Sequence, residues 1–427
     1  MLMLKRVLMN VVAFGFFGIL GLGALAWRPA IAPIIPPSVG SFTPASVAKG
    51  ATLASAGYCA DCHTANGGPK FAGGYAITTA IGAIYSTNIT PDPETGIGTW
   101  SEAAFARAMR EGIARDGSLL FPVFPYGHFS KLSDADVQAL YAYFMTRAPV
   151  RNQVQENALP FPLNIRYLQA GWRLLFFRSA RFEPDAHKSA EWNRGAYLAE
   201  GLSHCGACHT PRNLLGAEKP DHAYTGAVVD NWTAPPLTAA NPAPVPWTQE
   251  ELFNYLRKGD SSLHGSAAGP MARVVSDLSA LSDEDVQALA TYFADVDNAG
   301  DRLASVGPAV ARAMSSARLG AGQDFEPGAR LYSVACAYCH YNSRHLALNS
   351  TLNLPDPTNL IQVVLHGIST TAGMRDVVMP GFAQALSDAD IAHVADYLRR
   401  TRTTLPLWPD LDVKIAAIRR LAEASPQ

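Results

Sequence analysis

Three short stretches of the chain carry the same three ligand-type residues at the same spacing. Each has two cysteines three positions apart and a histidine directly after the second cysteine. The triplets are Cys59, Cys62 and His63; Cys205, Cys208 and His209; and Cys336, Cys339 and His340. This spacing is the attachment signature of a c-type haem: the thiols form thioethers with the vinyl groups, and the histidine becomes the proximal iron ligand. The sequence therefore predicts three covalently bound haems.

The six cysteines have two other possible uses. They could form disulfide bonds, for which six cysteines allow fifteen connectivities, or pairs of them could share a tetrahedral zinc ion. Neither use explains a histidine after every second cysteine, and three pairs leave a four-cysteine zinc site one pair short. Because every cysteine of the chain lies in one of these motifs, we interpret all three as haem sites.

Two methionines are candidates for the distal iron ligand, on the opposite side of the haem from the histidine. For the third haem, Met379 is followed by Pro380 and lies shortly before a predicted helix. Met374 is a weaker rival because it lacks such a proline. For the second haem, the candidate is Met271 in a Gly-Pro-Met sequence. A loop methionine could also merely fill a gap in the core, but the position of both in the repeat favours iron ligation.

The first haem departs from this pattern. Its corresponding loop, residues 121–129, has Phe124 where methionine is expected, and a phenyl ring cannot ligate iron. His128 follows four residues later and could give a bis-histidine site. Alternatives are Met109 on the preceding predicted helix, an open iron, and a His128 that only forms hydrogen bonds. The choice affects function because methionine ligation raises the reduction potential relative to two histidines.

One helical unit is repeated around the three motifs. Each copy opens with a Gly-Ala pair at the head of a helix that runs into the motif, at Gly50, Gly195 and Gly328. Each copy closes with a Leu-Ser-Asp-x-Asp sequence that starts at Leu132, Leu281 and Leu386. The serine is an expected N-cap, the second aspartate completes a start like a capping box, and apolar residues then recur at helical spacing. The sequence predicts three small helical haem domains in series.

We therefore expect an all-α protein with three tandem cytochrome c-like domains and an N-terminal transmembrane helix. The haem domains are placed at residues 45–150, 188–300 and 301–402, the last with a leading linker. The other segments are a signal or transmembrane anchor (1–27), a Pro-rich tether (28–44), a linker (151–187) and a C-terminal docking helix (403–427). The linker contains the apolar run 172–177, which either packs on a haem domain or contacts the membrane or a partner protein.

Residues 7–26 form an apolar stretch in which Asn10 is the only strongly polar side chain. A small-residue sequence at 24–26 is compatible with a cleaved signal peptide, whereas the length is compatible with an uncleaved anchor. Lys5 and Arg6 precede the stretch, so under either interpretation the rest of the chain lies outside the cytoplasm. We expect an anchored protein on the periplasmic side of the inner membrane, with cleavage possible.

The composition argues against nucleic acid as a partner. The formal net charge is −2, so there is no excess of basic residues to attract a polyanion. Charged residues make up only 16% of the chain and hydrophobic residues 48%. Haem burial and contact with partner subunits both account for such a low charge content.

Several longer stretches resemble a known family. YSTNITPDPETGIG at residues 85–98 with Trp100, CHTPRN at 208–213 and GPMA at 269–272 look like the triheme cytochrome c subunits of bacterial membrane-bound dehydrogenases. The resemblance runs from about residue 40 to 400. This family serves quinoprotein alcohol dehydrogenases, flavin-dependent gluconate and fructose dehydrogenases, and molybdenum hydroxylase-type aldehyde or isoquinoline oxidoreductases.

Within that family, the version of the 121–129 loop found here is similar to partners of molybdenum hydroxylase-type aldehyde dehydrogenases. The stretch 27–33 looks like the same branch. The resemblance implies a catalytic subunit with molybdopterin, a small subunit with two [2Fe–2S] clusters, and ubiquinone as electron acceptor. Family resemblance alone does not establish a substrate.

We thus expect a non-catalytic electron-transfer subunit that passes electrons from an aldehyde-oxidising partner to ubiquinone. One alternative is the cytochrome subunit of a quinoprotein or flavin alcohol or gluconate dehydrogenase. Another is a free-standing or oxidase-associated electron carrier. A haem enzyme such as a peroxidase would require an open iron, which only the first haem could provide.

Overall fold

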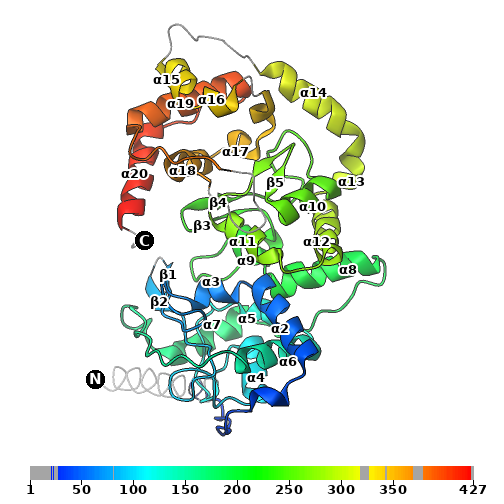
Figure 1. Cartoon of the computed structure of the whole chain (residues 1–427), viewed down its shortest axis with the longest axis vertical. Coiled ribbons are helices and arrows are strands. Elements are labelled where there is room, and N and C mark those ends of the chain that lie inside the picture. Colours follow the sequence, from blue (N-terminus) through cyan, green and yellow to red (C-terminus); the bar gives the residue numbers. More distant parts are fainter. Residues whose placement is uncertain are drawn as a thin grey trace, which may run out of the picture. The chain divides into compact units, whose positions relative to one another are not determined.

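The computed structural model describes residues 21, 23, 27–79, 81–317, 327–341, 344–368 and 378–424. Contacts between residues divide the chain into two compact units. Unit 1 comprises Met1–Glu183, Glu200–His204 and Leu214–Ala217, and unit 2 comprises Pro184–Ala199, Cys205–Asn213 and Glu218–Gln427. Unit 1 contains the first CxxCH motif, and unit 2 contains the second and third (Figure 1).

The expectation of an all-α fold with an N-terminal transmembrane helix is wrong. Six short strands pair into three antiparallel hairpins within the described residues: β1 (Ala76–Thr79) with β2 (Gly82–Tyr85), β3 (Ala227–Val229) with β4 (Trp232–Ala234), and β5 (Asp260–Ser261) with β6 (Gly265–Ser266). β-Branched residues in β1 and β3 favour extended backbone. No helix in this part of the chain is long and apolar enough to cross a membrane. Apart from Gly21 and Gly23, residues 7–26 lie outside the described residues.

Unit 1 contains one copy of the repeat and residues 151–183 of the linker. Its elements are η1 (Val39–Ser41), α2 (Pro44–Ala56), α3 (Cys59–His63), β1, β2, α4 (Glu102–Glu111), α5 (Tyr126–Phe129), α6 (Asp134–Met145), η2 (Arg166–Leu168) and α7 (Gln169–Phe176). Thr43 caps α2 and Pro44 occupies its first position, as is common at helix starts. Helix α4 ends at Gly112, whose φ of 61° suits glycine at a left-handed C-cap.

Unit 2 contains two further copies. The second is built from α8 (Ala190–Tyr197), α9 (Gly206–His209), η4 (Pro220–His222), β3, β4, α10 (Gln249–Lys258), β5, β6, α11 (Pro270–Leu278) and α12 (Asp283–Val296); the residues of η3 (Leu198–Leu202) are divided between the two units. The connection to the third copy is α13 (Ala299–Arg302), η5 (Leu303–Ser305) and α14 (Val306–Ser316). The third copy has α15 (Pro327–Ala335), α16 (Ala337–His340), η6 (Arg344–Leu348), α17 (Ser350–Asn353), α18 (Thr358–His366), α19 (Asp388–Arg402) and α20 (Leu411–Ala424).

The last helix of each copy starts where the Leu-Ser-Asp-x-Asp sequence predicts. Ser133, Ser282 and Ser387 are the N-caps of α6, α12 and α19, and each side chain accepts a hydrogen bond from the backbone N–H three residues later. In α19, Ser387 and Asp390 form a complete capping box, with the aspartate side chain also accepting from the N-cap backbone.

The first and last helices of each copy cross in close contact at a glycine. A Cβ atom on Gly50 would lie 1.9 Å from the carbonyl oxygen of Ala139, one on Gly195 would lie 2.0 Å from that of Ala288, and one on Gly328 would lie 2.2 Å from that of His393. The helix pairs are α2 with α6, α8 with α12, and α15 with α19. Only glycine allows two helix backbones to approach so closely. The Gly-Ala pairs therefore mark the points of helix contact.

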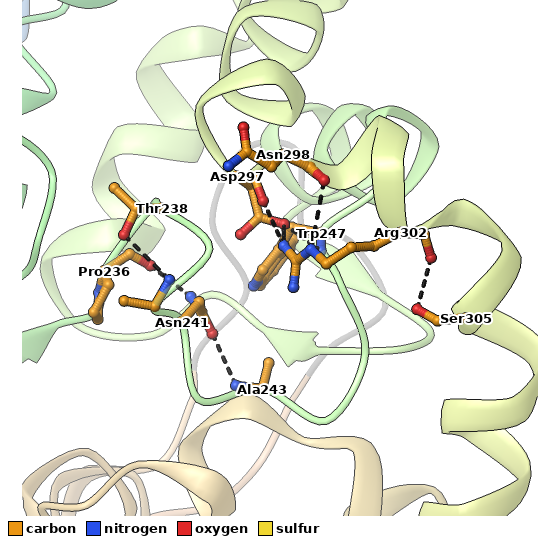
Figure 2. Close-up of polar contacts among 10 residues, drawn as sticks. Pro236, Thr238, Asn241, Ala243, Trp247, Asp297, Asn298, Arg302 and Ser305 are labelled. Carbon is orange, nitrogen blue, oxygen red and sulfur yellow. Dashed lines mark hydrogen bonds and ion pairs between the residues drawn. The ribbon is translucent and has the colours of Figure 1, made fainter.

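The buried side chain of Asp297 forms hydrogen bonds at the start of the connection between the second and third copies (Figure 2). Asp297 is 2% exposed and accepts hydrogen bonds from the backbone N–H of Trp247, at 3.2 Å, and from the guanidinium of Arg302. Arg302 also donates to the backbone carbonyl of Asp297. Burial raises the pKa of Asp297 to about 6, although Arg302 and the Trp247 N–H act in the opposite direction. These contacts fix the path of the chain as it leaves α12.

Substitution of Gly195 by alanine should destabilise unit 2. The added Cβ would meet the carbonyl of Ala288, so the two helices must move apart, at a cost of about 1–3 kcal/mol or more. Denaturant unfolding followed by far-UV circular dichroism measures this loss. Gly307→Ala in α14 is the matched control, since no atom lies within 4 Å of the added Cβ there. Equal stability of the two variants would show that the crossing is not tight.

Candidate haem-binding sites

Each CxxCH motif forms a single turn of helix. The first is α3 itself, whereas in α9 and α16 the first cysteine is the N-cap and already has helical angles, with φ −55° and ψ −33° at Cys205. Residues i, i+3 and i+4 lie on one face of a helix, so the two sulfurs and the imidazole of each motif project to the same side. A c-type haem needs this arrangement, because the two cysteines bond to its edge as thioethers and the histidine binds its iron.

The cysteines are not paired with one another. No disulfide bond joins any two of the six. Among the described residues, no three His, Cys, Asp or Glu side chains cluster in a way that could hold a metal ion directly. The disulfide and zinc interpretations therefore find no corresponding geometry in this part of the chain.

The thiols of Cys205, Cys208 and Cys336 are partly buried. Burial raises the pKa of Cys205 to about 12 and also raises the pKa values of Cys208 and Cys336. A thiol in such surroundings is a poor thiolate and behaves as a small hydrophobic group. The partial burial of these three sulfurs is compatible with thioether bonds to a largely apolar ring.

Backbone carbonyls orient the histidines of the first two motifs. His63 Nδ1 lies 2.6 Å from the carbonyl oxygen of Thr87, and His209 Nδ1 lies 2.8 Å from that of Pro235. Since a carbonyl can only accept, Nδ1 carries the hydrogen and Nε2 keeps the lone pair needed to bind iron. Burial lowers the pKa of both imidazoles, while each carbonyl raises it. The neutral tautomer suited to ligation is thus the favoured one.

The loop after the motif has the same structure in the first and second copies. Thr64 Oγ1 accepts from the N–H of Phe71 at 3.2 Å, and Thr210 Oγ1 accepts from the N–H of Tyr224 at 3.1 Å. Phe71 and Tyr224 have φ values of 65° and 59°, and their rings pack edge-on against the last helix of their copy. Sequence reasoning did not single out these residues. The threonine directly after both motifs is the signal that could have found them.

The structure aligns the distal loops of the first two copies. Leu120 N–H bonds to the carbonyl of Gly112 at 2.8 Å, and Ala267 N–H bonds to that of Gly259 at the same distance. Four residues beyond these bonds stand Phe124 in the first copy and Met271 in the second. Phe124 therefore occupies the place of Met271 in the repeat. Met271 lies in the first turn of α11, partly buried against a cluster that includes Ala267 and Val275.

His128 lies on α5, four residues after Phe124. Its Nδ1 is 2.8 Å from the carbonyl oxygen of Glu200, so the hydrogen again sits on Nδ1. The His128 ring lies 6.2 Å from that of His204. The rival candidate Met109 is buried in α4 at 8% exposure. The distal ligand of the first haem stays a prediction.

In the third copy, Met379 forms an antiparallel bridge with Ile368, with two hydrogen bonds of 2.9 Å. The bridge holds the methionine loop to the end of α18, shortly before α19. Gly367 has a φ of 75°, and a Cβ there would lie 2.2 Å from the Met379 carbonyl oxygen, so glycine is required beside the loop. Met374 lies outside the described residues.

Comparison with known proteins explains this repeated framework. The family model "Cytochrome c" matches residues 47–148, and "Cytochrome C oxidase, cbb3-type, subunit III" matches residues 323–398. The gluconate 2-dehydrogenase cytochrome c subunit of Pantoea cypripedii is 39% identical over 382 residues, which cover 83% of this chain and 85% of that protein. The chain belongs to the dehydrogenase cytochrome c subunit family. Members of this family transfer electrons, and their cytochrome c domains imply covalently bound haem c.

Two further relatives illustrate the range of the family. The fructose dehydrogenase cytochrome subunit of Gluconobacter japonicus is 38% identical over 387 residues, covering 83% of this chain and 78% of that protein. A nicotinate dehydrogenase subunit of Pseudomonas putida is 47% identical over 407 residues, 93% of this chain. The chain spans only 34% of the length of that nicotinate dehydrogenase subunit.

Replacement of Thr210 by valine should destabilise the second haem-binding copy. Valine has the same shape but no acceptor, so the N–H of Tyr224 loses its partner, at a cost of about 1–3 kcal/mol. Thr210→Ser keeps the acceptor and is the control. Denaturant unfolding of both variants tests the prediction, which fails if valine and serine give the same midpoint.

Proposed function

We propose that this protein binds three c-type haems and carries electrons from a catalytic dehydrogenase subunit to ubiquinone, on the periplasmic side of the inner membrane. The observation that carries the proposal is the threefold recurrence of one framework. In each copy a CxxCH turn follows a helix whose glycine contacts the capped last helix. No residue of the chain is assigned a catalytic role in substrate chemistry.

When bound, haem c supplies a one-electron iron couple whose potential depends on its axial ligands and burial. The chain's part is to hold that group. We assign the thioether bonds to the six cysteines and proximal ligation to His63, His209 and His340. Met271 and Met379 are assigned as distal ligands of the second and third haems. His128 is assigned to the first haem, with Met109 as the alternative.

The partner that we favour is a molybdenum hydroxylase-type dehydrogenase with a small iron–sulfur subunit. The loop at residues 121–129 supports this branch by resemblance. The chain is also more similar to the nicotinate dehydrogenase relative, at 47% identity, than to the fructose and gluconate dehydrogenase relatives, at 38% and 39%, and we take this as support for a partner other than a sugar dehydrogenase. The second candidate is the cytochrome subunit of a flavin or quinoprotein dehydrogenase, which the similarity to those relatives keeps open.

Purification from native membranes in mild detergent tests the partner. We expect molybdenum, together with iron in excess of the three atoms of the haems, to elute with the cytochrome when metals are measured against haem content. A co-eluting flavin or quinone cofactor without molybdenum would instead identify the second candidate. A bare cytochrome would contradict both and leave a free-standing carrier.

Substitution of His128 by alanine should change the absorption spectrum and potential of one haem only. Loss of a second histidine should shift that potential upward, on the order of 0.1 V within the roughly 0.8 V that axial ligands span. Spectroelectrochemical titration of the purified protein measures the effect. Met271→Ala should alter a different haem.

His187→Ala is the control for that experiment. His187 is exposed and does not belong to the distal loop of any haem-binding copy. This substitution should leave all three haems unchanged. If His128→Ala behaves in the same way as His187→Ala, His128 is not an iron ligand.

A further inference from the structure

Residues 161–175 of unit 1 expose an unusual amount of apolar surface. Seven large hydrophobic side chains in this short segment are exposed: Phe161, Leu163, Ile165, Tyr167, Leu168, Leu174 and Leu175. Phe161 is 81% exposed and Leu175 is 63% exposed. Scattered apolar side chains are normal on a protein surface, but a dense group marks an interaction site. We call these seven residues the apolar surface.

The segment is packed firmly on its unit, which determines what faces outward. Ala170 of α7 is buried with Ile113 and Leu119. The ring of Tyr126 makes edge contacts with Trp172 and Phe177, at 6.3 and 5.0 Å between centroids. With that side of α7 occupied, Leu174 and Leu175 are left on the outer side. The apolar surface is thus part of a fixed structure.

A neighbouring turn extends the same surface. Trp172 Nε1 donates to the carbonyl oxygen of Leu215 at 2.9 Å, which places residues 214–215 beside α7 within unit 1. Leu214 and Leu215 are themselves strongly exposed, Leu215 at 61%. Two separate chain segments therefore contribute exposed leucines to one region.

The charged side chains within residues 157–182 are all arginines. Residues 157–182 contain no Asp, Glu or Lys and four arginines: Arg166, Arg173, Arg178 and Arg181. Arg173 donates to the backbone carbonyl of Glu111, and Arg178 donates to those of Leu174 and Phe177. A carbonyl does not neutralise a guanidinium, so Arg178, which is exposed, retains its positive charge beside Leu174 and Leu175. Arg173 instead lies over the rings of Tyr126 and Phe177, on the packed side of α7. Arg181 is paired with Asp134.

The backbone at Arg28 also lies next to this region. The carbonyl oxygen of Arg28 approaches Gly117 so closely that a Cβ there would lie 2.1 Å from it. The neighbouring Ser118 accepts a hydrogen bond from Arg166 of the exposed segment. Trp27 precedes this contact and is 68% exposed. A further large aromatic side chain is therefore exposed one residue before the contact at Gly117.

We propose that the apolar surface inserts shallowly into the headgroup region of an anionic lipid bilayer. Exposed Leu, Phe, Tyr and Trp side chains beside arginines are the combination that binds the membrane–water interface. The arginines complement the negative surface potential of anionic lipids. The proposal deepens the membrane location given under the proposed function and depends on it. It assigns the contact to a surface of unit 1.

Site-directed nitroxide labelling tests this assignment in the full chain. Leu175→Cys is labelled and the protein is placed in vesicles of phosphatidylethanolamine and phosphatidylglycerol. The native cysteines are expected to be thioethers, so only the added thiol reacts. Val413→Cys on α20 is the matched control, because Val413 is also a helical residue and is 68% exposed. Collisions with oxygen, which enters lipid, are compared with collisions with a water-soluble nickel complex.

We expect the Leu175 label to collide at least several-fold more with oxygen, relative to the nickel complex, than the Val413 label. Equal exposure of both labels to the nickel complex would overturn the proposal. Exclusion of both reagents from the Leu175 label would also overturn it and indicate a protein partner on the surface. Ubiquinone reduction by the purified dehydrogenase complex is measured on the same variant. Intact reduction with a water-exposed label would refute the docking surface alone and leave the electron route standing.

Discussion

The close contact between the first and last helices of each copy is the constraint on which the rest of the structure depends. At Gly50, Gly195 and Gly328 the two backbones come so near that no side chain fits between them. This contact fixes the CxxCH turn, which follows the first helix, relative to the last helix. In the first two copies, the aromatic residue of the loop after the motif packs on that last helix. One backbone contact thus determines where the sulfurs and the imidazole point.

The rest of the proximal side is held by hydrogen bonds to the backbone. The carbonyls of Thr87 and Pro235 bond to Nδ1 of His63 and His209 and so favour the tautomer in which Nε2 carries the free lone pair that binds iron. The distal side is less uniform. Met271 begins a helix, whereas Met379 lies in an extended bridge. A single scaffold therefore supports a constant proximal ligand and a variable distal loop, which is where the potential of each haem can be adjusted.

The surface of unit 1 adds a second level of organisation. An electron carrier between a dehydrogenase and a quinone must keep its haems near the membrane, because ubiquinone is dissolved in the bilayer. Leu174 and Leu175 are available for a membrane contact because Ala170 and Trp172 pack the opposite side of α7 against the rest of unit 1. In the membrane contact that we propose, Arg178 beside Leu174 gives this surface a preference for anionic headgroups.

The sequence by itself determined the features that are local or repeated. The three CxxCH motifs, the serine caps of α6, α12 and α19, and the recurrence of the Gly-Ala pairs follow from residue type and spacing. The contact of these glycines with the last helices was found only in the structure. The tertiary structure alone decided the features that depend on distant parts of the chain. The hairpin strands β1 to β6 are too short for a periodic signal. The carbonyl of Glu200 that bonds His128 lies 72 residues away. Packing on Tyr126 divides the apolar run at 172–177 into a partly buried side and an exposed side, which no periodicity within six residues can reveal.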